Sequence, residues 1–377
     1  MSQRYLGGWI QDGLFNPLAA PTPSGYTYEL WSWGYNASGQ LGLGNTTNYS
    51  SPKQVGALTT WSKISAGSNQ TLAVKTDGTL WSWGYNLYGQ LGLGNITNYS
   101  SPKQVGALTT WSSITAGLYH TLAIKTDGTL WTWGYNASGQ LGLGNTTNYS
   151  SPKQVGALTT WSSITAGSFH SLAIKTDGTL WSWGRNNNGQ LGLGNITYYS
   201  SPKQIGALAT WLNITAGPYQ TLAIKTNGTL WSWGANDFGQ LGLGNITNYS
   251  SPKQVGALTT WSKITVGFYH TLAIKTDGTL WSWGRNNSGQ LGLGNITNYS
   301  SPKQVGVLTT WLNITAGSYQ TLAIKTNGTL WSWGRNTSGQ LGLGNTTDYS
   351  SPKQVGALAT WYAVAKTFGN FSIALKY

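Results

Sequence analysis

Apolar and polar residues alternate over short stretches that recur every fifty residues along this chain. In one unit, Trp61 to Gly67, Thr71 to Lys75 and Thr79 to Gly84 place apolar side chains at every second position, the period of a β-strand with one buried face. A weaker stretch, Lys103 to Ala107, predicts a fourth strand. No stretch of the unit has helical periodicity, so we predict an all-β fold.

The dipeptide Asp77-Gly78 separates the second and third predicted strands, and Asn227-Gly228 and Asn327-Gly328 stand at equivalent positions. Such dipeptides supply positive φ at both central positions of a two-residue hairpin turn, which predicts antiparallel pairing. Seven copies of one four-stranded antiparallel unit at a fixed period indicate a repeat protein. We therefore predict a seven-bladed β-propeller, in which ring closure leaves only short edges.

The two ends of the chain are complementary halves of one unit. Glu29-Leu30-Trp31 begins at the third strand, and Phe371 to Lys376 ends on the second. We predict that residues 28–58 and 359–377 share the last blade, so that pairing of the N- and C-terminal strands closes the ring. An open solenoid would need polar capping repeats, and none is visible. The predicted domains are an extended N-terminal arm, residues 1–27, and a propeller, residues 28–377.

One repeat carries a family resemblance in four runs of sequence. These runs are Ala116 to Ile124, Asp127-Gly128, Trp131-Thr132-Trp133-Gly134 and Gly139-Gln140-Leu141-Gly142. Together they resemble the repeat of the regulator of chromosome condensation family, over residues 28–377. The resemblance implies a seven-bladed propeller. Members of that family act in guanine-nucleotide exchange on chromatin, in ultraviolet-B perception in plants or as scaffolds, so the resemblance leaves function open. The exchange factor uses an inserted wedge, for which the unbroken period leaves no room.

Composition favours a structural role for the tryptophans. The chain has no cysteine, and 21 of its 22 tryptophans fall at the three positions equivalent to Trp31, Trp33 and Trp61, where we expect core packing. The net charge is +13, and lysines equivalent to Lys53 and Lys75 form two rings. We interpret both rings as a solvated rim. Without arginine clusters or basic runs, nucleic acid is not an expected partner.

The polar residues give little support for catalysis. Four of the eight acidic residues, Asp77, Asp127, Asp177 and Asp277, lie in the predicted turns. The glycine-rich run 39–45 lacks the strand-to-helix context of a phosphate-binding loop, so we expect its glycines to serve positive φ and close packing. Three histidines, His120, His170 and His270, share a position with glutamine, which favours hydrogen bonding within the blades over metal binding. We predict no enzyme activity, no cofactor and no metal.

Differences between the repeats concentrate at positions 35–38, 46–48 and 68–70 and their equivalents, which the predicted topology places on one face of the disc. Loops on a rigid scaffold commonly carry binding residues. By resemblance to the plant photoreceptor, aromatic residues of the 68–70 loops would ring the channel mouth. They form either a stacking surface for protein or sugar or a plug of the channel. The predicted partner-binding residues are Tyr119, Phe169, Tyr219, Tyr269 and Tyr319, with Tyr88 and Phe238.

Residues 1–27 lie outside the repeat, and Tyr5, Trp9, Ile10 and Phe15 are the residues through which we expect this arm to be anchored. Its Arg4-Tyr5-Leu6-Gly7-Gly8 and Asn16-Pro17-Leu18 resemble the leader of structural proteins of tailed phages. We predict no signal peptide and no membrane span. The main hypothesis is a virion decoration or adhesion protein whose partners are other virion proteins or a host surface component, with assembly into oligomers. The alternatives are a cytoplasmic protein-binding scaffold and a carbohydrate-binding module that recognises a glycan.

Overall fold

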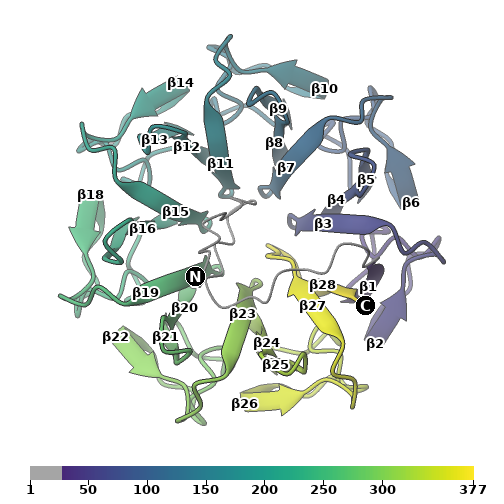
Figure 1. Cartoon of the computed structure of the whole chain (residues 1–377), viewed down its shortest axis with the longest axis vertical. Helices are drawn as coiled ribbons and strands as arrows, with labels where there is room; N and C mark the ends of the chain where they lie inside the picture. Colours follow the sequence, from purple (N-terminus) through teal and green to yellow (C-terminus); the bar gives the residue numbers. More distant parts are fainter. Residues whose placement is uncertain (1–27) are drawn as a thin grey trace, which may run out of the picture.

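The computed structural model describes residues 28–377, which form a closed ring of seven four-stranded antiparallel sheets (Figure 1). This confirms the predicted all-β, seven-bladed propeller. The expected arm and its residues Tyr5, Trp9, Ile10 and Phe15 lie outside the described residues, so the arm stays a prediction.

The first strand of each blade starts at a tryptophan and lies nearest the central axis: β3 (Trp61–Ala66), β7 (Trp111–Ala116), β11 (Trp161–Ala166), β15 (Trp211–Ala216), β19 (Trp261–Val266), β23 (Trp311–Ala316) and β27 (Trp361–Val364). The second strands are β4 (Gln70–Lys75), β8 (His120–Lys125), β12 (His170–Lys175), β16 (Gln220–Lys225), β20 (His270–Lys275), β24 (Gln320–Lys325) and β28 (Phe371–Lys376). The third strands are β1 (Glu29–Gly34), β5 (Leu80–Gly84), β9 (Leu130–Gly134), β13 (Leu180–Gly184), β17 (Leu230–Gly234), β21 (Leu280–Gly284) and β25 (Leu330–Gly334). The outer strands are β2 (Tyr49–Gln54), β6 (Tyr99–Gln104), β10 (Tyr149–Gln154), β14 (Tyr199–Gln204), β18 (Tyr249–Gln254), β22 (Tyr299–Gln304) and β26 (Tyr349–Gln354).

The outer strand lies earlier in the chain than the sequence pattern predicted. Strand β6 ends at Gln104, and Gly106 has a φ of +60°, so the prediction of a strand over Lys103 to Ala107 was wrong. Its pairing with β5 is irregular between the Ser82–Lys103 and Gly84–Tyr99 pairs. Pro102, which has no N–H to donate, lies inside this irregularity, and a bulge of this kind breaks the alternation that sequence reasoning depends on.

The hairpin turn is also longer than predicted. Gly78 N donates to Lys75 O over 3.0 Å and Lys75 N donates to Thr79 O over 3.0 Å, so the loop contains three residues and not two. Positive φ at Gly78, +77°, fits a turn followed by a single left-handed residue. Asp77 fixes the loop because its Oδ1 accepts from the Thr79 N–H and hydroxyl over 2.9 and 2.6 Å.

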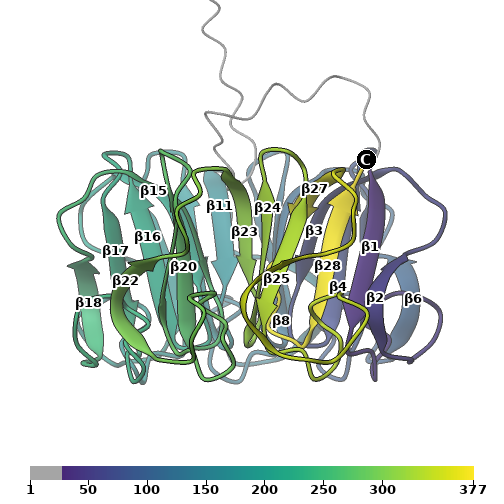
Figure 2. The same cartoon turned by 90° about the horizontal axis from the view of Figure 1, so that it is seen from below.

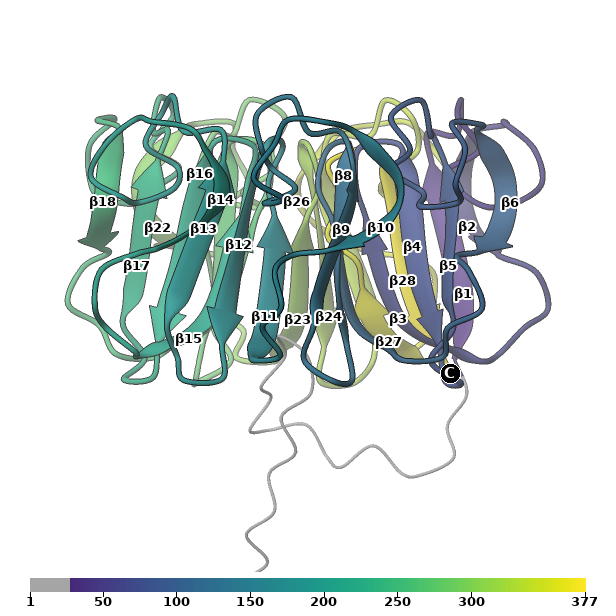
Figure 3. The same cartoon turned by 90° about the horizontal axis from the view of Figure 1, so that it is seen from above.

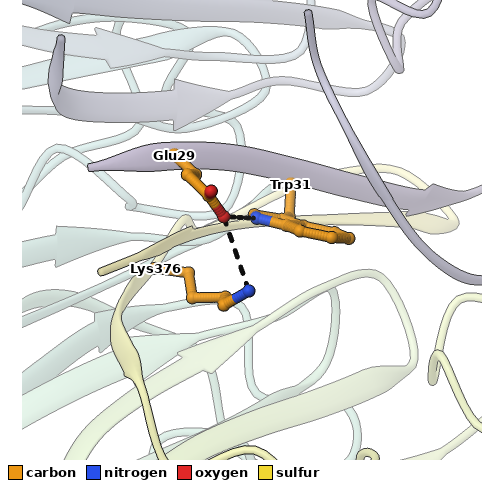
Figure 4. Close-up of polar contacts among 3 residues, drawn as sticks. All are labelled: Glu29, Trp31 and Lys376. Carbon is orange, nitrogen blue, oxygen red and sulfur yellow. Dashed lines mark hydrogen bonds and ion pairs between the residues drawn. The ribbon is translucent and has the colours of Figure 1, made fainter. Parts of the chain in front are cut away.

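Pairing between the terminal strands closes the ring as predicted. Strands β1 and β28 are antiparallel from the Glu29–Lys376 pair to the Gly34–Phe371 pair, and the sheet order is β2-β1-β28-β27. In a complete blade, Trp81 Nε1 donates to Thr79 Oγ1 over 3.0 Å. In the closing blade, Glu29 takes this place: its Oε2 accepts from Trp31 Nε1 over 2.9 Å and lies 3.4 Å from Lys376 Nζ (Figure 4).

Three tyrosines strengthen the same joint. Tyr28 stacks on Tyr362 with ring centroids 4.3 Å apart, and Tyr377 lies 5.4 Å from Tyr28 and 5.7 Å from Tyr362. The position of Tyr362 holds serine or leucine in the other blades. Aromatic pairs contribute about 0.5–1.5 kcal/mol beyond their buried area, so this cluster stabilises a joint that has no hairpin connection.

Neighbouring blades are joined through one tryptophan in each unit. Trp83 is fully buried, and its Nε1 donates over 2.9 Å to the backbone carbonyl of Gln40 in the preceding blade. Thr71 Oγ1 donates to the same carbonyl over 2.8 Å. The tryptophan bond recurs at every junction: Trp33 to Gln340, Trp133 to Gln90, Trp183 to Gln140, Trp233 to Gln190, Trp283 to Gln240 and Trp333 to Gln290.

The glycines of the 39–45 run make this junction possible, as predicted. Gly42 has a φ of +75°, and a Cβ there would lie 2.6 Å from Trp83 Nε1. Gly56 has a similar φ of +64°, but a Cβ there would meet nothing within 4 Å. An L-residue would be strained at both positions, but only at Gly42 would its side chain also meet a neighbouring atom.

We expect Gly56→Ala to destabilise the protein by about 1–2 kcal/mol, the cost of a left-handed L-residue. Gly42→Ala should cost about 1–3 kcal/mol more, because the added methyl group overpacks the junction. Chemical denaturation of the two variants measures this difference directly. Equal losses would show that the Trp83 junction tolerates a methyl group.

We also expect that removal of Phe371 to Tyr377 destroys cooperative unfolding. The deletion removes β28 and exposes the edges of β1 and β27, which then pair between molecules. Thermal unfolding and light scattering together test this. A truncated chain that melts like the full chain and stays monomeric would contradict the role of β28 in closure.

Candidate functional site

The two faces of the disc carry different connections. The loops that follow the first and third strands begin on one face, which we call the loop face. The three-residue turns lie on the opposite, turn face, together with Tyr28 and the C-terminus (marked at the top of Figure 2 and the bottom of Figure 3). All three variable stretches of the repeat therefore belong to the loop face.

Backbone hydrogen bonds fix the tips of these loops beside each other. Gly117 N donates to His120 O over 2.8 Å, which closes the tip that carries Tyr119. The carbonyl of Tyr119 then accepts from Tyr135 N over 2.9 Å, so the tip of a blade lies against the first residue of its long loop. The bond recurs between Arg185 N and Phe169 O at 2.8 Å.

Buried asparagines order the long loop. Asn36 is fully buried, its Nδ2 donates to the carbonyls of Asn45 and Thr47 over 3.0 Å, and its Oδ1 accepts from Leu41 N over 2.9 Å. These bonds replace the sheet ladder that an irregular segment lacks. The variable residues that precede and follow them consequently project from a fixed backbone.

Aromatic rings form a contiguous group over the loops of three neighbouring blades. Tyr88 lies 5.2 Å from Tyr119 and 4.8 Å from Tyr135, between ring centroids. Tyr85 lies 6.1 Å from Tyr119, and Tyr135 lies 6.1 Å from Phe169. All five rings are half-buried, so each packs on its neighbours and keeps part of its surface exposed.

Arginines continue this group around the ring. Arg185 lies over Phe169 and Tyr219, with its Cζ 5.5 and 5.9 Å from the two centroids. Arg285 lies over three rings, those of Phe238, Tyr319 and Tyr269, at 5.0, 5.2 and 5.7 Å. These distances are those of cation–π contacts, which hold a guanidinium group in place without an acidic partner.

We call this surface the aromatic–arginine arc. It contains all seven predicted partner-binding residues together with six others, which lie at equivalents of positions 35 and 68 in the predicted variable stretches. The predicted members are Tyr88, Tyr119, Phe169, Tyr219, Phe238, Tyr269 and Tyr319; the added members are Tyr85, Tyr135, Arg185, Phe268, Arg285 and Arg335. A signal for the arginines was present, since every arginine after Arg4 stands at the position equivalent to Tyr35.

The arc does not close. The tip positions Asn69 and Gly369 carry no aromatic ring, whereas Tyr35 keeps a half-buried ring at the start of the long loop of the closing blade. Phe368 contacts Phe268 at 6.3 Å but is 1 % exposed, so it is core. The interruption lies at the closing blade, and the arc covers the loops of the other six blades.

Three lysines in or just after the innermost strands bond backbone carbonyls of other blades. Lys366 Nζ donates to the carbonyl of Ala216, which lies 150 residues away in the chain. Lys263 Nζ donates to Leu312 O over 2.5 Å, and Lys63 Nζ donates to Ser112 O. Burial lowers the pKa of Lys366 to about 7 and the pKa values of Lys63 and Lys263 to about 8. These lysines bond backbone carbonyls at the ends of the inner strands.

The two rings of lysines on the rim differ. Lys53 is exposed, in agreement with a solvated rim, and its Nζ lies 5.5 Å from the Tyr49 centroid. Lys75 is half-buried, with Nζ 3.8 Å from the Trp81 centroid and 5.3 Å from that of Trp61. The interpretation as a solvated rim was wrong for this second ring, because the packing of two tryptophans encloses the ammonium group.

The histidines make hydrogen bonds, as predicted, but the bonds join neighbouring blades, so the prediction of bonding within the blades was wrong. His120 Nε2 lies 2.9 Å from Ser171 Oγ, which itself donates to Gln140 O, so the imidazole is the donor. His170 and His270 contact Thr221 and Thr321 in the same way at 3.2 and 3.3 Å. Their Nδ1 atoms are buried and have no hydrogen-bond partner among residues 28–377. Burial lowers all three pKa values to about 3.

Comparisons with known families agree with the repeat. A model described as the RCC1-like domain matches residues 24–211. Two models of the regulator of chromosome condensation (RCC1) repeat match the remainder, one at 227–274, 277–324 and 327–366 and the other at 212–240, 261–290 and 312–340. No curated protein matches the sequence. Residues 28–377 also contain no helix long and apolar enough to cross a membrane.

Solved structures share the fold. Prp20p from Saccharomyces cerevisiae is similar with a TM-score of 0.84 and 22% identity, over 94% of this chain and 92% of that protein. The same yeast protein bound to Kap60 gives 0.84 and 22%, over 94% and 89%. Human WBSCR16 gives 0.82 and 22%, over 93% and 98%. At this identity the likeness concerns the fold alone.

The buried histidines predict a loss of stability in acid. Their pKa is about 3 in the folded protein and about 6.5 when unfolded, so the unfolded chain binds more protons between these values. Their contribution is complete above about pH 6.5 and declines as the pH falls. We expect His120→Gln, His170→Gln and His270→Gln together to flatten the melting temperature between about pH 7 and about pH 5.

The glutamines at equivalent positions make this a matched exchange. Gln70 Nε2 already donates over 3.0 Å to the carbonyl of Gly117 in the next blade. A triple variant with the pH dependence of the unchanged protein would show that other groups cause it.

Proposed function

Because the chain belongs to the regulator of chromosome condensation (RCC1) repeat family, we propose that it is a non-enzymatic scaffold that binds a protein partner through the aromatic–arginine arc. The observation that carries the proposal is the gathering of every propeller arginine and most loop aromatics on one face of the disc, over the loops of six blades. The strands beneath the arc scarcely vary between blades, whereas its residues do.

The composition of the arc is that of an interface centre. Tyrosine and arginine are enriched among residues that dominate binding energy, in part because large rings lose little conformational entropy on binding. Contacts within the arc reduce that loss further: Arg285 is held over three rings before any partner arrives. The surface is therefore preorganised, which favours affinity.

The charge of the arc indicates the chemistry of the partner. Arg185, Arg285 and Arg335 have no acidic partner within ion-pair distance in the described ring. A partner with carboxylates beside aromatic or aliphatic side chains would form ion pairs with these guanidinium groups. Protein binding is also the role named for one fold relative, since Prp20p is described as binding Gsp1p and histones.

The virion hypothesis is without support from these findings. Its basis was the leader sequence, which lies in residues 1–27 outside the described part of the chain. The matching family models and structural relatives favour the scaffold alternative instead. A glycan at the arc is likewise unsupported, and the boundary between arm and propeller at residue 28 stays a proposal.

The test compares two surface variants of the full chain. The arc variant carries Tyr119→Ala, Tyr269→Ala and Arg285→Ala, and the control variant carries Lys103→Ala, Lys153→Ala and Lys253→Ala on the rim. We expect the arc variant to lose the partner that the unchanged chain and the control retain in affinity capture with quantitative mass spectrometry. Removing one interface hot spot costs about 2 kcal/mol or more, so the loss should exceed about tenfold.

Thermal unfolding of both variants separates binding from folding. The arc residues are only half-buried, so the arc variant should melt cooperatively. Retention of the same partners by the arc variant, or equal loss from both variants, would contradict the proposal.

A further inference from the structure

Pockets lie between neighbouring blades, away from the arc and beside the half-buried ring of lysines. The pocket beside Lys225 has a volume of about 390 Å³, and its walls include Leu208, Trp211, Trp231 and Pro252. The pocket beside Lys325 has a volume of about 370 Å³ and equivalent walls. Such volumes are at the lower end of the range for small-molecule sites, about 300–1,000 Å³.

Each of these two pockets has a lysine ammonium group enclosed by indoles. Lys225 Nζ lies 3.9 Å from the Trp231 centroid and 4.8 Å from that of Trp211. Lys325 Nζ lies 3.7 and 5.0 Å from the centroids of Trp331 and Trp311. Burial lowers the pKa of both lysines from its ordinary value. Neither ammonium group has an acidic partner within ion-pair distance among residues 28–377.

In the closing blade, the lysine at the equivalent position has an acidic partner. Lys376 stands at the equivalent position, with Nζ 4.6 Å from the Trp31 centroid. There the Glu29 carboxylate lies 3.4 Å from the ammonium group (Figure 4). A lysine held against tryptophan in this fold therefore accepts a carboxylate without disturbing the blade.

The residue two positions after the lysine distinguishes the remaining blades. Four blades carry aspartate there. Burial lowers the pKa of Lys125, and the nearby Asp127 carboxylate opposes this shift; hydrogen bonds from Thr129 lower the pKa of Asp127, with a smaller contribution from Lys125. The blades of Lys225 and Lys325 carry Asn227 and Asn327 instead. Asn227 Oδ1 keeps the turn, since it accepts from Thr229 Oγ1 over 2.7 Å as aspartate does elsewhere. Only the negative charge is missing.

A second donor lies in the wall of each pocket. Trp211 and Trp311 are 5% and 4% exposed, and both line their pockets. Their Nε1 atoms are buried and have no acceptor in the described part of the chain. A buried donor without an acceptor is costly, so a ligand that accepts a hydrogen bond from Nε1 would bind more tightly.

We propose that the pockets beside Lys225 and Lys325 bind a small organic carboxylate, whose charged group pairs with the lysine while its body lies against the tryptophan, leucine and proline walls. The equivalent pockets in the blades of Asp127 and Asp177 bind it weakly, because these carboxylates repel the incoming charge. The chain then has two such sites. This proposal is independent of the protein partner at the arc.

Phenylacetate is the probe, and phenylacetamide is its uncharged counterpart. Isothermal titration of the full chain should give two equivalent sites for phenylacetate, with tryptophan fluorescence as a second readout. Phenylacetamide should bind at least about tenfold more weakly, a difference of about 1.4 kcal/mol. Glucuronate carries the same charged group on a sugar: tighter binding than phenylacetate assigns the sites to acidic sugars, and weaker binding assigns them to apolar acids.

Exchange of the turn residues provides matched variants, because both residue types already occur at this position. Asn227→Asp with Asn327→Asp should weaken phenylacetate binding at least about tenfold. Asp127→Asn with Asp177→Asn, beside the two equivalent pockets, should raise the number of sites from two to four. The proposal would be overturned if phenylacetamide bound as tightly as phenylacetate, or if neither phenylacetate nor glucuronate bound. It would also be overturned if the number of sites did not change with the exchange of the turn residues.

Discussion

The hydrogen bond from the Trp83 indole to the carbonyl of Gln40 is the contact on which the rest of the ring depends. It joins a buried strand of one blade to the loop of the preceding blade, and it recurs at all seven junctions. Its acceptor is a backbone atom, so the loop must hold one shape. Asn36 supplies that shape through its hydrogen bonds, and Gly42 leaves the space that the indole fills.

This constraint separates structure from function along the chain. Strand residues and the 39–45 run form the contacts between neighbouring blades, so they scarcely change from blade to blade. Residues at loop tips and at the start of the long loop do not enter the junctions and can vary. In the fold these variable residues meet on one face, where they form the aromatic–arginine arc. A rigid ring thereby presents an adaptable surface.

Aromatic rings, more than acidic residues, accommodate the positive charge of the propeller. The ring of lysines equivalent to Lys75 lies against tryptophans, and the ring equivalent to Lys53 lies over tyrosines. In the described ring the Glu29–Lys376 pair is the single ion pair, and it stands at the closure. Cation–π contacts hold these groups but leave their charge uncancelled, which is why carboxylate-bearing partners suit both the arc and the pockets.

The sequence alone determined the number of blades, the strand order and the closure, because these follow from alternation and from the complementary ends of the chain. It failed where the pattern was broken by a bulge, as at β6, and where turn length depends on backbone pairing, as at Gly78. Tertiary structure alone decided which distant residues meet. Arg285 contacts rings from three blades, and Lys366 reaches Ala216 across 150 residues, because ring closure brings together positions that no local period relates.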